Sequence, residues 1–298
     1  MLIAVTGATG FVGRHIAALL PGRGHRLRAL VRPRTRTRPS VGPALELVPG
    51  ELADSGALAA LVQGADAVIH LVGIIVEAGP ATFGAVHVEG TRRLLAAAVH
   101  AGVGRFVHMS AIGARAEPGA TPYHRTKWQA EELVRGSGLC SAVFRPSLIS
   151  GPESAPIRAI ARLHRWSPVV PIFGDGRFST QPVWIGDVAL AFARAVEDSA
   201  LVGVFELGGP AVLTYEDLVR AVGRASGHPR PVVHVPLAVT RAAAAAFDWL
   251  GARAPLTSDQ LQMLVEGSAT PANALRSVFG IRPLSFEAGL ARYLGPAG

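Results

Sequence analysis

The stretch that decides the fold is Thr6-Gly7-Ala8-Thr9-Gly10-Phe11-Val12-Gly13-Arg14, which follows the apolar run Ile3-Ala4-Val5. Its three glycines recur every third residue, between a predicted strand and a helix predicted to begin near Phe11. In such a turn one glycine permits a tight bend, another lets a pyrophosphate approach the backbone, and the last lets helix and strand pack closely. The free N–H groups at the start of the helix would bind the phosphates. The pattern therefore predicts a dinucleotide site formed by Gly7, Thr9, Gly10, Phe11, Val12, Gly13 and Arg14.

The rest of the first half alternates short apolar runs with helical patterns, which is typical of βαβ units. The strand-like runs cover residues 3–5, 27–31, 45–48, 67–71, 105–109 and 141–145. They read as nearly continuous apolar segments, as expected for strands that are buried on both faces. The predicted fold class is α/β, a Rossmann doubly wound parallel sheet with a smaller, discontinuous C-terminal lobe.

The texture of the sequence changes after about Ser150, where proline and glycine become frequent. A later run, 183–189, opens a helix with Asp187 in its first turn, and 204–207 is a further strand candidate. We therefore predict a dinucleotide-binding domain of residues 1–150 plus about 183–207. The remainder, about 151–182 plus 208–298, would form a lobe for substrate or partner.

Composition excludes several classes of protein. With 49% hydrophobic and 17% charged residues, the chain of 298 residues is not intrinsically disordered. Its single cysteine, Cys140, excludes an internal disulfide framework and fits a reducing compartment. The net charge of +8 is accompanied by no helix-turn-helix, zinc or base-stacking pattern, so we expect no nucleic-acid partner and no metal site. Residues 2–5 already read as a strand and not as a targeting segment, so we expect a cytoplasmic protein.

Two segments of the predicted second lobe leave alternatives open. The apolar run 237–250 is favoured as a core helix, but it could also line a pocket for a lipid-like or quinone substrate. It could instead make a peripheral contact at the inner face of a membrane. The basic stretch Arg158, Arg162, His164 and Arg165 is favoured as a solvated face, with an acidic or phosphorylated substrate as the alternative. The sequence makes no prediction of oligomeric state.

The residues at the end of the second predicted strand indicate whether the cofactor is NAD(H) or NADP(H). An NAD site usually places an acid there, but this strand runs into Arg32-Pro33-Arg34 with no acid nearby. Arg32, helped by Arg14, could instead pair with a 2′-phosphate, which favours NADP(H) over NAD(H). The alternative is that Arg32 stands in solvent, one of the arginines clustered at 32, 34, 36 and 38. Glu51, after the third strand, is either an adenine contact or an exposed loop acid.

Tyr123 and Lys127 form the candidate catalytic pair, because residues at i and i+4 share one face of a helix. An ammonium beside the phenol would lower the pKa of the tyrosine and make it a usable proton donor or acceptor. Lys127 is the only lysine in the chain and lies four residues after one of only three tyrosines. Ser110, at the end of the strand 105–109, could hold a substrate oxygen where charge develops.

With these residues in place, the chain resembles the extended or atypical short-chain dehydrogenases/reductases. The matching motifs are the three glycines, the set Ser110, Tyr123 and Lys127, Arg145-Pro146-Ser147 followed by Gly151-Pro152, and Gly186-Asp187-Val188-Ala189. More narrowly, it is similar to the family of the NADPH-binding accessory subunit of respiratory complex I and its bacterial relatives. That similarity rests on His70-Leu71-Val72-Gly73, Val86-His87-Val88-Glu89-Gly90-Thr91, His108-Met109-Ser110-Ala111-Ile112-Gly113, Arg125-Thr126-Lys127, Gln181-Pro182-Val183 and Leu256-Thr257-Ser258-Asp259-Gln260.

The resemblance implies a role for each matching residue. Tyr123 would be the acid/base, Lys127 would bind the nicotinamide ribose, and Ser110 would orient the substrate carbonyl. Pro146 would border the nicotinamide, and Leu71, Val72 and Gly73 would line the cofactor site. One position departs from the family, because His87 stands where many members carry an asparagine linked to a proton relay. A buried structural histidine is the favoured interpretation of His87.

Two functions of different class follow. The first is an NADP(H)-binding oxidoreductase, or a related epimerase or dehydratase, acting on an unidentified carbonyl or hydroxyl substrate. The second is a cofactor-holding accessory or assembly protein of a respiratory complex or quinone pathway, with little turnover. A dinucleotide sensor without chemistry is disfavoured, because the catalytic set is intact.

Overall fold

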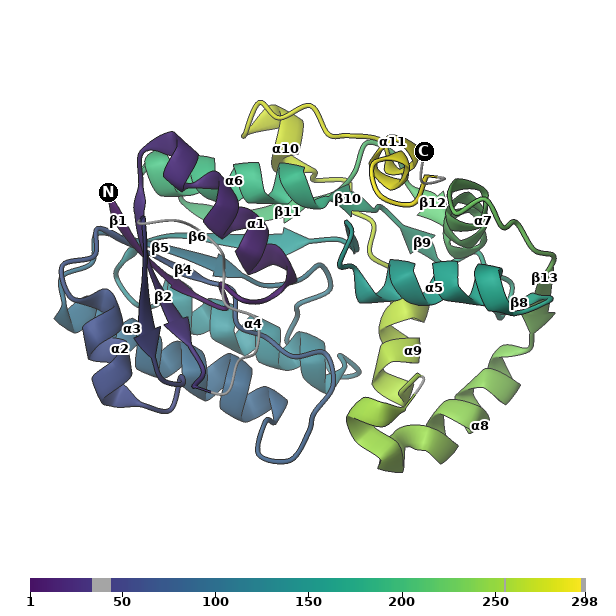
Figure 1. Cartoon of the computed structure of the whole chain (residues 1–298). Helices are drawn as coiled ribbons and strands as arrows, with labels where there is room; N and C mark the ends of the chain where they lie inside the picture. The colour runs from purple at the N-terminus through teal and green to yellow at the C-terminus, as the bar shows by residue number, and fades with distance from the viewer. Residues whose placement is uncertain (34–43, 255, 296–298) are drawn as a thin grey trace. The chain divides into compact units, whose positions relative to one another are not determined.

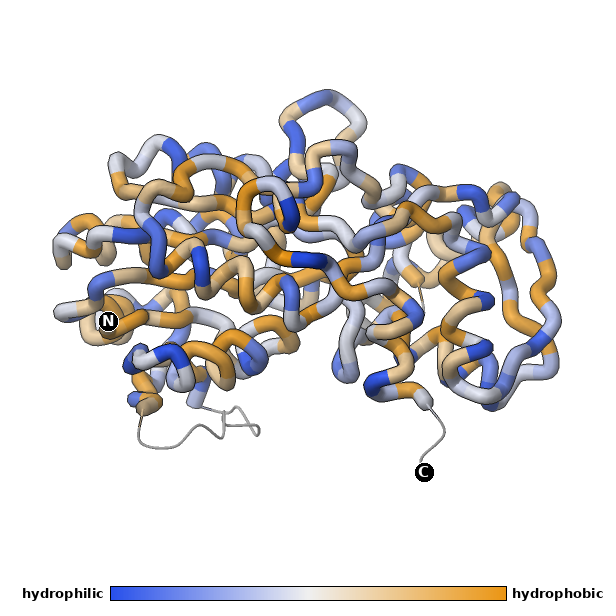
Figure 2. The backbone as a smooth tube through the Cα atoms, turned by 90° about the horizontal axis from the view of Figure 1, so that it is seen from above, coloured by the Kyte–Doolittle hydropathy of each residue, from blue (hydrophilic) through white to orange (hydrophobic). Residues whose placement is uncertain are grey.

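The computed structural model describes residues 1–33, 44–254 and 256–295, so Arg34, Arg36 and Arg38 of the arginine cluster lie outside the described residues. The chain divides into two compact units. The first unit joins Met1–Arg145 to Val188–Glu206, and the second joins Pro146–Asp187 to Leu207–Gly298. Hydrophobic and hydrophilic stretches alternate along the backbone throughout the described chain (Figure 2).

The first unit is built on a seven-stranded sheet in the order β11-β6-β5-β4-β1-β2-β3 (Figure 1). The strands are β1 (Leu2–Thr6), β2 (Arg26–Val31), β3 (Leu45–Pro49), β4 (Ala67–His70), β5 (Arg105–Met109), β6 (Cys140–Pro146) and β11 (Gly203–Leu207). The pairings from β6 across to β3 are all parallel. All six strand runs expected in the first half are present, as is the later one at 204–207, and the predicted α/β Rossmann class is confirmed.

Helices cover both faces of this sheet, α1 and α6 on one side and α2, α3 and α4 on the other (Figure 1). Their bounds are α1 (Phe11–Leu19), η1 (Pro21–Arg23), α2 (Ser55–Val62), η2 (Gly84–Glu89), α3 (Gly90–His100), α4 (Pro122–Arg135) and α6 (Ile185–Glu197). Side-chain caps fix two of the starts: Asp54 accepts a hydrogen bond from the Ala57 N–H, and Thr121 accepts one from His124. A core of Leu58, Leu61, Val68, Leu94, Phe106 and Val143 fills the space between sheet and helices.

The strand order determines where a ligand can bind. β1 lies between β4 and β2. The chain adds β2 and β3 on one side of β1 and then crosses over to place β4 on its other side. In open parallel sheets this reversal opens a crevice outside the carboxyl ends of the two central strands. The glycine turn after β1 and the segment after β4 both lie at that edge.

In its described residues the second unit holds three two-stranded sheets and several helices. Its strands are β7 (Ile149–Ser150), β8 (Val170–Phe173), β9 (Ser179–Thr180), β10 (Val183–Trp184), β12 (Leu213–Thr214) and β13 (Val232–Val235). Its helices are α5 (Ala155–Trp166), α7 (Tyr215–Ala225), α8 (Leu237–Phe247), η3 (Asp248–Arg253), α9 (Ser258–Glu266), α10 (Ala274–Ser277) and α11 (Phe286–Ala291). Ile157, Ile172, Val219, Val222 and Leu290 belong to its own hydrophobic core.

The expectation that residues 237–250 pack as a core helix is wrong. Within α8 only Thr240 and Ala244 are buried. Phe247 is 42% exposed and Trp249, in the following turn, is 82% exposed. The apolar residues of this run are short alanines and outward-facing large side chains, so the helix has no wide face that reaches the core.

A smaller expectation concerns Asp187. Asp187 does lie in the first turn of α6, where its carboxylate accepts a hydrogen bond from the Leu284 N–H at 2.8 Å. No helix in the described part of the chain is long and apolar enough to cross a bilayer.

Candidate functional site

The glycine turn after β1 has a backbone that side chains would disrupt. Gly7 has φ +79°, in the left-handed region that favours glycine. A Cβ added at Gly13 would overlap the Gly7 carbonyl oxygen and lie 2.7 Å from the Ala8 Cα. The turn is closed by the Gly10 N–H, which donates to the Gly7 carbonyl at 3.0 Å. Gly7 and Gly13 are therefore required by the path of the chain.

The start of α1 is open to an anion. Gly10 is its N-cap and provides no side-chain hydrogen bond, and no acidic residue stands in the first turn. The first N–H groups of the nine-residue helix thus lack a side-chain acceptor, and the helix dipole makes this end positive. Arg14 folds back and donates to the Thr9 carbonyl at 3.1 Å. The turn and helix start fit a dinucleotide pyrophosphate by this chemistry.

The segment after β4 neighbours both the glycine turn and Lys127. A Cβ at Gly7 would stand 3.1 Å from both the Leu71 carbonyl carbon and the Val72 nitrogen. Two residues later in the segment after β4, a Cβ at Gly73 would lie 2.8 Å from the Lys127 Nζ. The predicted phosphate-binding and catalytic residues thus share the carboxyl edge of the sheet.

Lys127 and Tyr123 come from the first two turns of α4, and the Lys127 side chain runs inward. It is 3% exposed, and its ammonium donates to the Met109 carbonyl at 3.1 Å. Tyr123 packs edge-on against Phe83 and His87, with ring centroids 5.9 Å and 5.6 Å away. Among the described residues, the Tyr123 hydroxyl has no hydrogen-bond partner. That hydroxyl is therefore available to a substrate.

The pKa values of Tyr123 and Lys127 differ from those that their i, i+4 spacing suggests. Burial raises the pKa of Tyr123 to about 12, so the expected lowering by the neighbouring ammonium does not occur. Burial lowers the pKa of Lys127 to about 8, although Glu131 opposes the shift. Loss of hydration thus sets the direction of the Tyr123 shift. At neutral pH the tyrosine is a protonated phenol, the form that donates a proton.

Ser110 is held inside the protein by a buried ion pair. Its hydroxyl donates to Glu131, whose carboxylate also accepts from Arg145 at 2.9 Å and 2.6 Å. Glu131 is fully buried and Ser110 is 3% exposed. The only proton of the hydroxyl is therefore used internally, and the substrate-orienting role of Ser110 stays a prediction. Glu131 was not singled out from the sequence, although it lies one helical turn after Lys127 on the same face.

His87 lies in η2, a π-helical turn of the kind often found at functional sites. Its Nε2 accepts from the Ile74 N–H at 3.1 Å, so the neutral ring carries its proton on Nδ1 and donates to Thr126 Oγ1 at 2.9 Å. Burial and the nearby Lys127 lower the pKa of His87 to about 3. The contacts of His87 are those of a buried neutral histidine that ties the segment after β4 to α4.

Two further histidines lie side by side beneath Lys127. His70 on β4 pairs in register with His108 on β5, and their ring centroids are 5.2 Å apart. His70 bonds Thr6 at 2.6 Å and Thr91 at 3.0 Å, whereas neither ring nitrogen of the buried His108 has a partner in the described part of the chain. Burial lowers the pKa of His70 to about 3, and that of His108 falls well below its usual value. Neither histidine was given a role from the sequence.

The other predicted cofactor contacts are Arg32, Glu51 and Pro146, and two of the three are exposed. Arg32 follows β2 and is exposed, with no hydrogen bond or ion pair among the described residues. Glu51 follows β3 and is also exposed. Pro146 is the last residue of β6 and is buried. No group of histidine, cysteine and acidic side chains suited to a metal occurs in the described residues.

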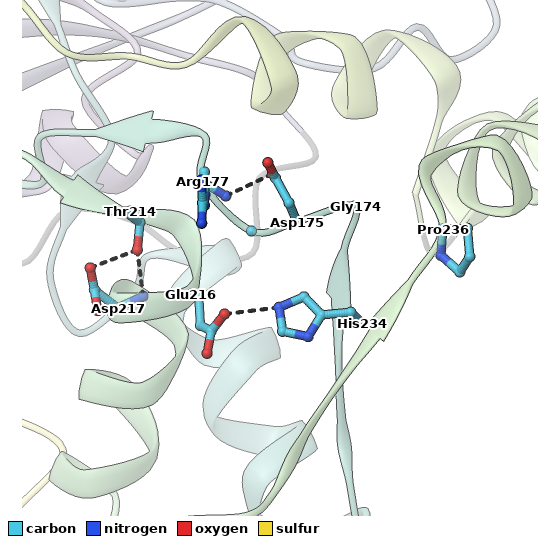
Figure 3. Close-up of a pocket in the computed structure, with 9 residues that line it drawn as sticks. Gly174, Asp175, Arg177, Thr214, Glu216, Asp217, His234 and Pro236 are labelled. Atoms are coloured by element: carbon cyan, nitrogen blue, oxygen red, sulfur yellow. Dashed lines mark hydrogen bonds and ion pairs between the residues drawn. The ribbon is translucent and has the colours of Figure 1, made fainter.

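The second unit has a pocket of its own, of about 880 Å³ (Figure 3). It is lined by Gly174, Asp175, Gly176, Arg177, Thr214, Glu216, Asp217, His234 and Pro236. Glu216 is paired with Arg220 and His234, and Asp217 accepts a hydrogen bond from the Thr214 hydroxyl. None of the predicted site residues lines this pocket.

Comparison with known proteins agrees with the geometry of the first unit. The chain is 35% identical to the ceramide reductase of Caulobacter vibrioides over 179 residues, or 58% of this chain and 54% of that protein. The chain thus spans about half the length of that relative. It is 27% identical to the NADH dehydrogenase [ubiquinone] 1 alpha subcomplex subunit 9 of Arabidopsis thaliana, covering 93% of this chain and 72% of that one. The sterol demethylase protein B of Methylococcus capsulatus is 27% identical, covering 98% and 96%.

Solved structures share the fold. The dTDP-glucose 4,6-dehydratase DesIV of Streptomyces venezuelae, with NAD bound, superposes with a TM-score of 0.76 at 23% identity, covering 99% of this chain and 96% of that chain. The UDP-glucose 4-epimerase of Thermus thermophilus, also with NAD, gives 0.75 at 23% identity, covering 99% and 98%. A family model matches residues 3–208, more than half of the chain. The glycine turn, the strand order and this match agree, and the chain belongs to the NAD dependent epimerase/dehydratase family of NAD(P)-dependent enzymes.

Proposed function

We propose that the chain is an NADP(H)-dependent oxidoreductase that interconverts a carbonyl and a hydroxyl group on a lipid-like substrate. The observation that carries the proposal is the Tyr123 hydroxyl, protonated and without an internal partner, one turn before a buried lysine that reaches Gly73. Gly73 follows the strand whose end packs against the phosphate-binding turn. The acid and the cofactor cradle therefore belong to one site.

In this reaction a bound nicotinamide dinucleotide supplies or accepts the hydride. The Tyr123 phenol would donate its proton to the substrate carbonyl oxygen, leaving a phenolate. The Lys127 ammonium, which donates to the Met109 carbonyl, would stabilise that phenolate and would hold the ribose of a bound cofactor. In the oxidative direction, Tyr123 recovers the proton from the alcohol.

The preference for NADP(H) rests on Arg32. Its guanidinium stands exposed at the end of β2, next to the central strand β1, where the family places the adenosine ribose. A free guanidinium can bind a 2′-phosphate through two parallel charge-assisted hydrogen bonds. The lack of a compensating internal partner among the described residues supports this use of Arg32.

The substrate class is taken from relatives. The names of three of them refer to apolar molecules: a ceramide reductase, a sterol demethylase protein and a 3 beta-hydroxysteroid dehydrogenase. We therefore propose a ketone or secondary alcohol on a long-chain or polycyclic apolar skeleton.

The test is a panel of such ketones incubated with the full chain and NADPH, with the loss of NADPH absorbance as the readout. We expect turnover by the wild-type chain, and a fall of about 10²- to 10⁴-fold in Tyr123→Phe, because the phenolic proton is removed while the ring stays. The variant should bind NADPH as the wild-type chain does. Unchanged turnover in Tyr123→Phe would exclude Tyr123 as the acid.

A second candidate function is a cofactor-holding accessory protein with little turnover. It is favoured by the similarity to the complex I alpha subcomplex subunit 9, which extends over 93% of this chain. This function predicts NADPH that stays bound in a one-to-one ratio through gel filtration and is not oxidised by any ketone of the panel. Exchangeable NADPH together with turnover would exclude it.

A further inference from the structure

Helix α5 of the second unit exposes two unlike stripes side by side. The helix buries Ile157, Ile160 and His164. Arg158, Arg162 and Arg165 recur at i, i+4 and i+7 and form a basic stripe on its exposed side. Ala159, Leu163 and Trp166 recur with the same spacing, one residue on, and form an adjacent apolar stripe.

The basic stripe is not neutralised by the protein. Helix α5 contains no acidic residue, and none of the three arginines has an ion-pair partner among the described residues. Arg165 is held over the ring of Trp166, with its guanidinium carbon 5.3 Å from the ring centroid. His164 belongs to the same basic stretch of sequence, but it is buried and bonds the Val219 carbonyl at 3.0 Å. Three positive charges therefore stand together on one exposed face.

The large side chains of the apolar stripe lie in solvent and do not pack into the core. Trp166 is 75% exposed, Leu163 40% and Val169, just beyond the helix, 41%. Tryptophan and arginine together are the residues that amphipathic helices use at the boundary between lipid headgroups and acyl chains. A nucleic-acid backbone would use the arginines but would leave Leu163 and Val169 in water.

We propose that this face of α5, formed by Arg158, Arg162, Leu163, Arg165, Trp166 and Val169, docks on the surface of an anionic phospholipid bilayer. The arginines contact the lipid phosphates, while Trp166 and Leu163 enter the headgroup layer. The charge of this face favours a bilayer as its partner. Three arginines without ion-pair partners in the described part of the chain lie beside an apolar stripe, and an anionic bilayer is negative at its surface and apolar beneath. This proposal does not rest on the proposed catalytic function.

The test is co-sedimentation of the full chain with phosphatidylcholine vesicles, either pure or containing about 30 mol% phosphatidylglycerol, at about 0.15 M salt. We expect binding to the anionic vesicles only, and release at about 1 M salt. The triple variant Arg158→Gln/Arg162→Gln/Arg165→Gln should bind on the order of 100-fold more weakly. Absence of binding by the wild-type chain overturns the proposal.

The matched control is Arg93→Gln/Arg276→Gln/Arg282→Gln, which removes three exposed arginines that lie outside α5 and lowers the net charge equally. We expect it to bind the anionic vesicles nearly as the wild-type chain does. Equal losses in both triple variants would mean that only the total charge of the chain matters, which also overturns the proposal. Far-ultraviolet circular dichroism checks that both variants are folded.

A second readout locates the contact. Vesicles with brominated acyl chains should quench the tryptophan fluorescence of the bound chain, and Trp166→Phe should remove most of that quenching. Trp249→Phe, which alters the exposed tryptophan after α8, should leave it intact. The reverse pattern would assign the contact to α8 and the turn after it, and would overturn the assignment to α5.

Discussion

At the scale of single residues, Lys127 carries the buried charge on which the proposed chemistry depends. Burial lowers its pKa to about 8 from an ordinary 10.5. The folded protein therefore bears a cost at pH values below 8, where the buried ammonium is charged, and that cost disappears as the pH rises from 8 to 10.5. The size of the cost is about 3 kcal/mol.

We expect Lys127→Met to lose most of the turnover and to gain free energy of unfolding relative to the wild-type chain at about pH 7. The gain should shrink between pH 8 and pH 10.5, because the wild-type lysine becomes neutral over that range. Urea unfolding at a series of pH values measures the difference. A difference between the two chains that does not change with pH would contradict the assigned burial of the ammonium.

His108 should also lower the stability of the fold, because both its ring nitrogens are buried without a partner among the described residues. We expect His108→Leu to stabilise the protein by about 1–3 kcal/mol near neutral pH, since the unpaired polar atoms are removed. His70→Leu is the matched comparison on the neighbouring strand, and it should destabilise because Thr6 and Thr91 lose their partner. A loss of stability in His108→Leu would show that the ring has a partner, such as a buried water.

At the scale of elements, the turn from β1 into α1 can be tested without touching the catalytic pair. Gly13→Ala places a methyl group against the Gly7 carbonyl oxygen and the Ala8 backbone, so the turn must open. We expect at least about a 10-fold loss of dinucleotide affinity, measured by calorimetric titration. Gly22→Ala, where a Cβ meets nothing within 4 Å, is the control and should bind normally. Equal binding by both variants would contradict the role of the turn.

The helices and strands also show which features of the fold can be predicted from sequence patterns. The strands of the sheet and the start of α1 at Phe11 were predicted, because period, glycine spacing and apolar runs are local properties. The exposure of α8 was not predicted, since a run of alanines looks apolar whether or not a core lies within reach. The Glu131 contact with Ser110 and Arg145 also escaped, because it joins three elements that are distant in sequence.

At the scale of the whole molecule, the first unit carries the proposed cofactor cradle and the proposed proton donor, and the second carries the α5 face. The cradle and the pair Tyr123 and Lys127 are predictions made from residue types and their spacing. The pKa of Tyr123 could not be predicted in the same way, because its direction depends on how far burial strips water from the phenol. Spacing alone suggests a nearby ammonium but does not indicate the desolvation of the phenol.

The most direct test of the proposed cofactor site is calorimetric titration of the purified full chain with NADPH and with NADH. We predict one site per chain that binds NADPH at least about 10-fold more tightly than NADH, a preference that Arg32→Ala should abolish. Equal affinity for the two cofactors would contradict the role of Arg32. Binding of neither cofactor would contradict the dinucleotide site itself.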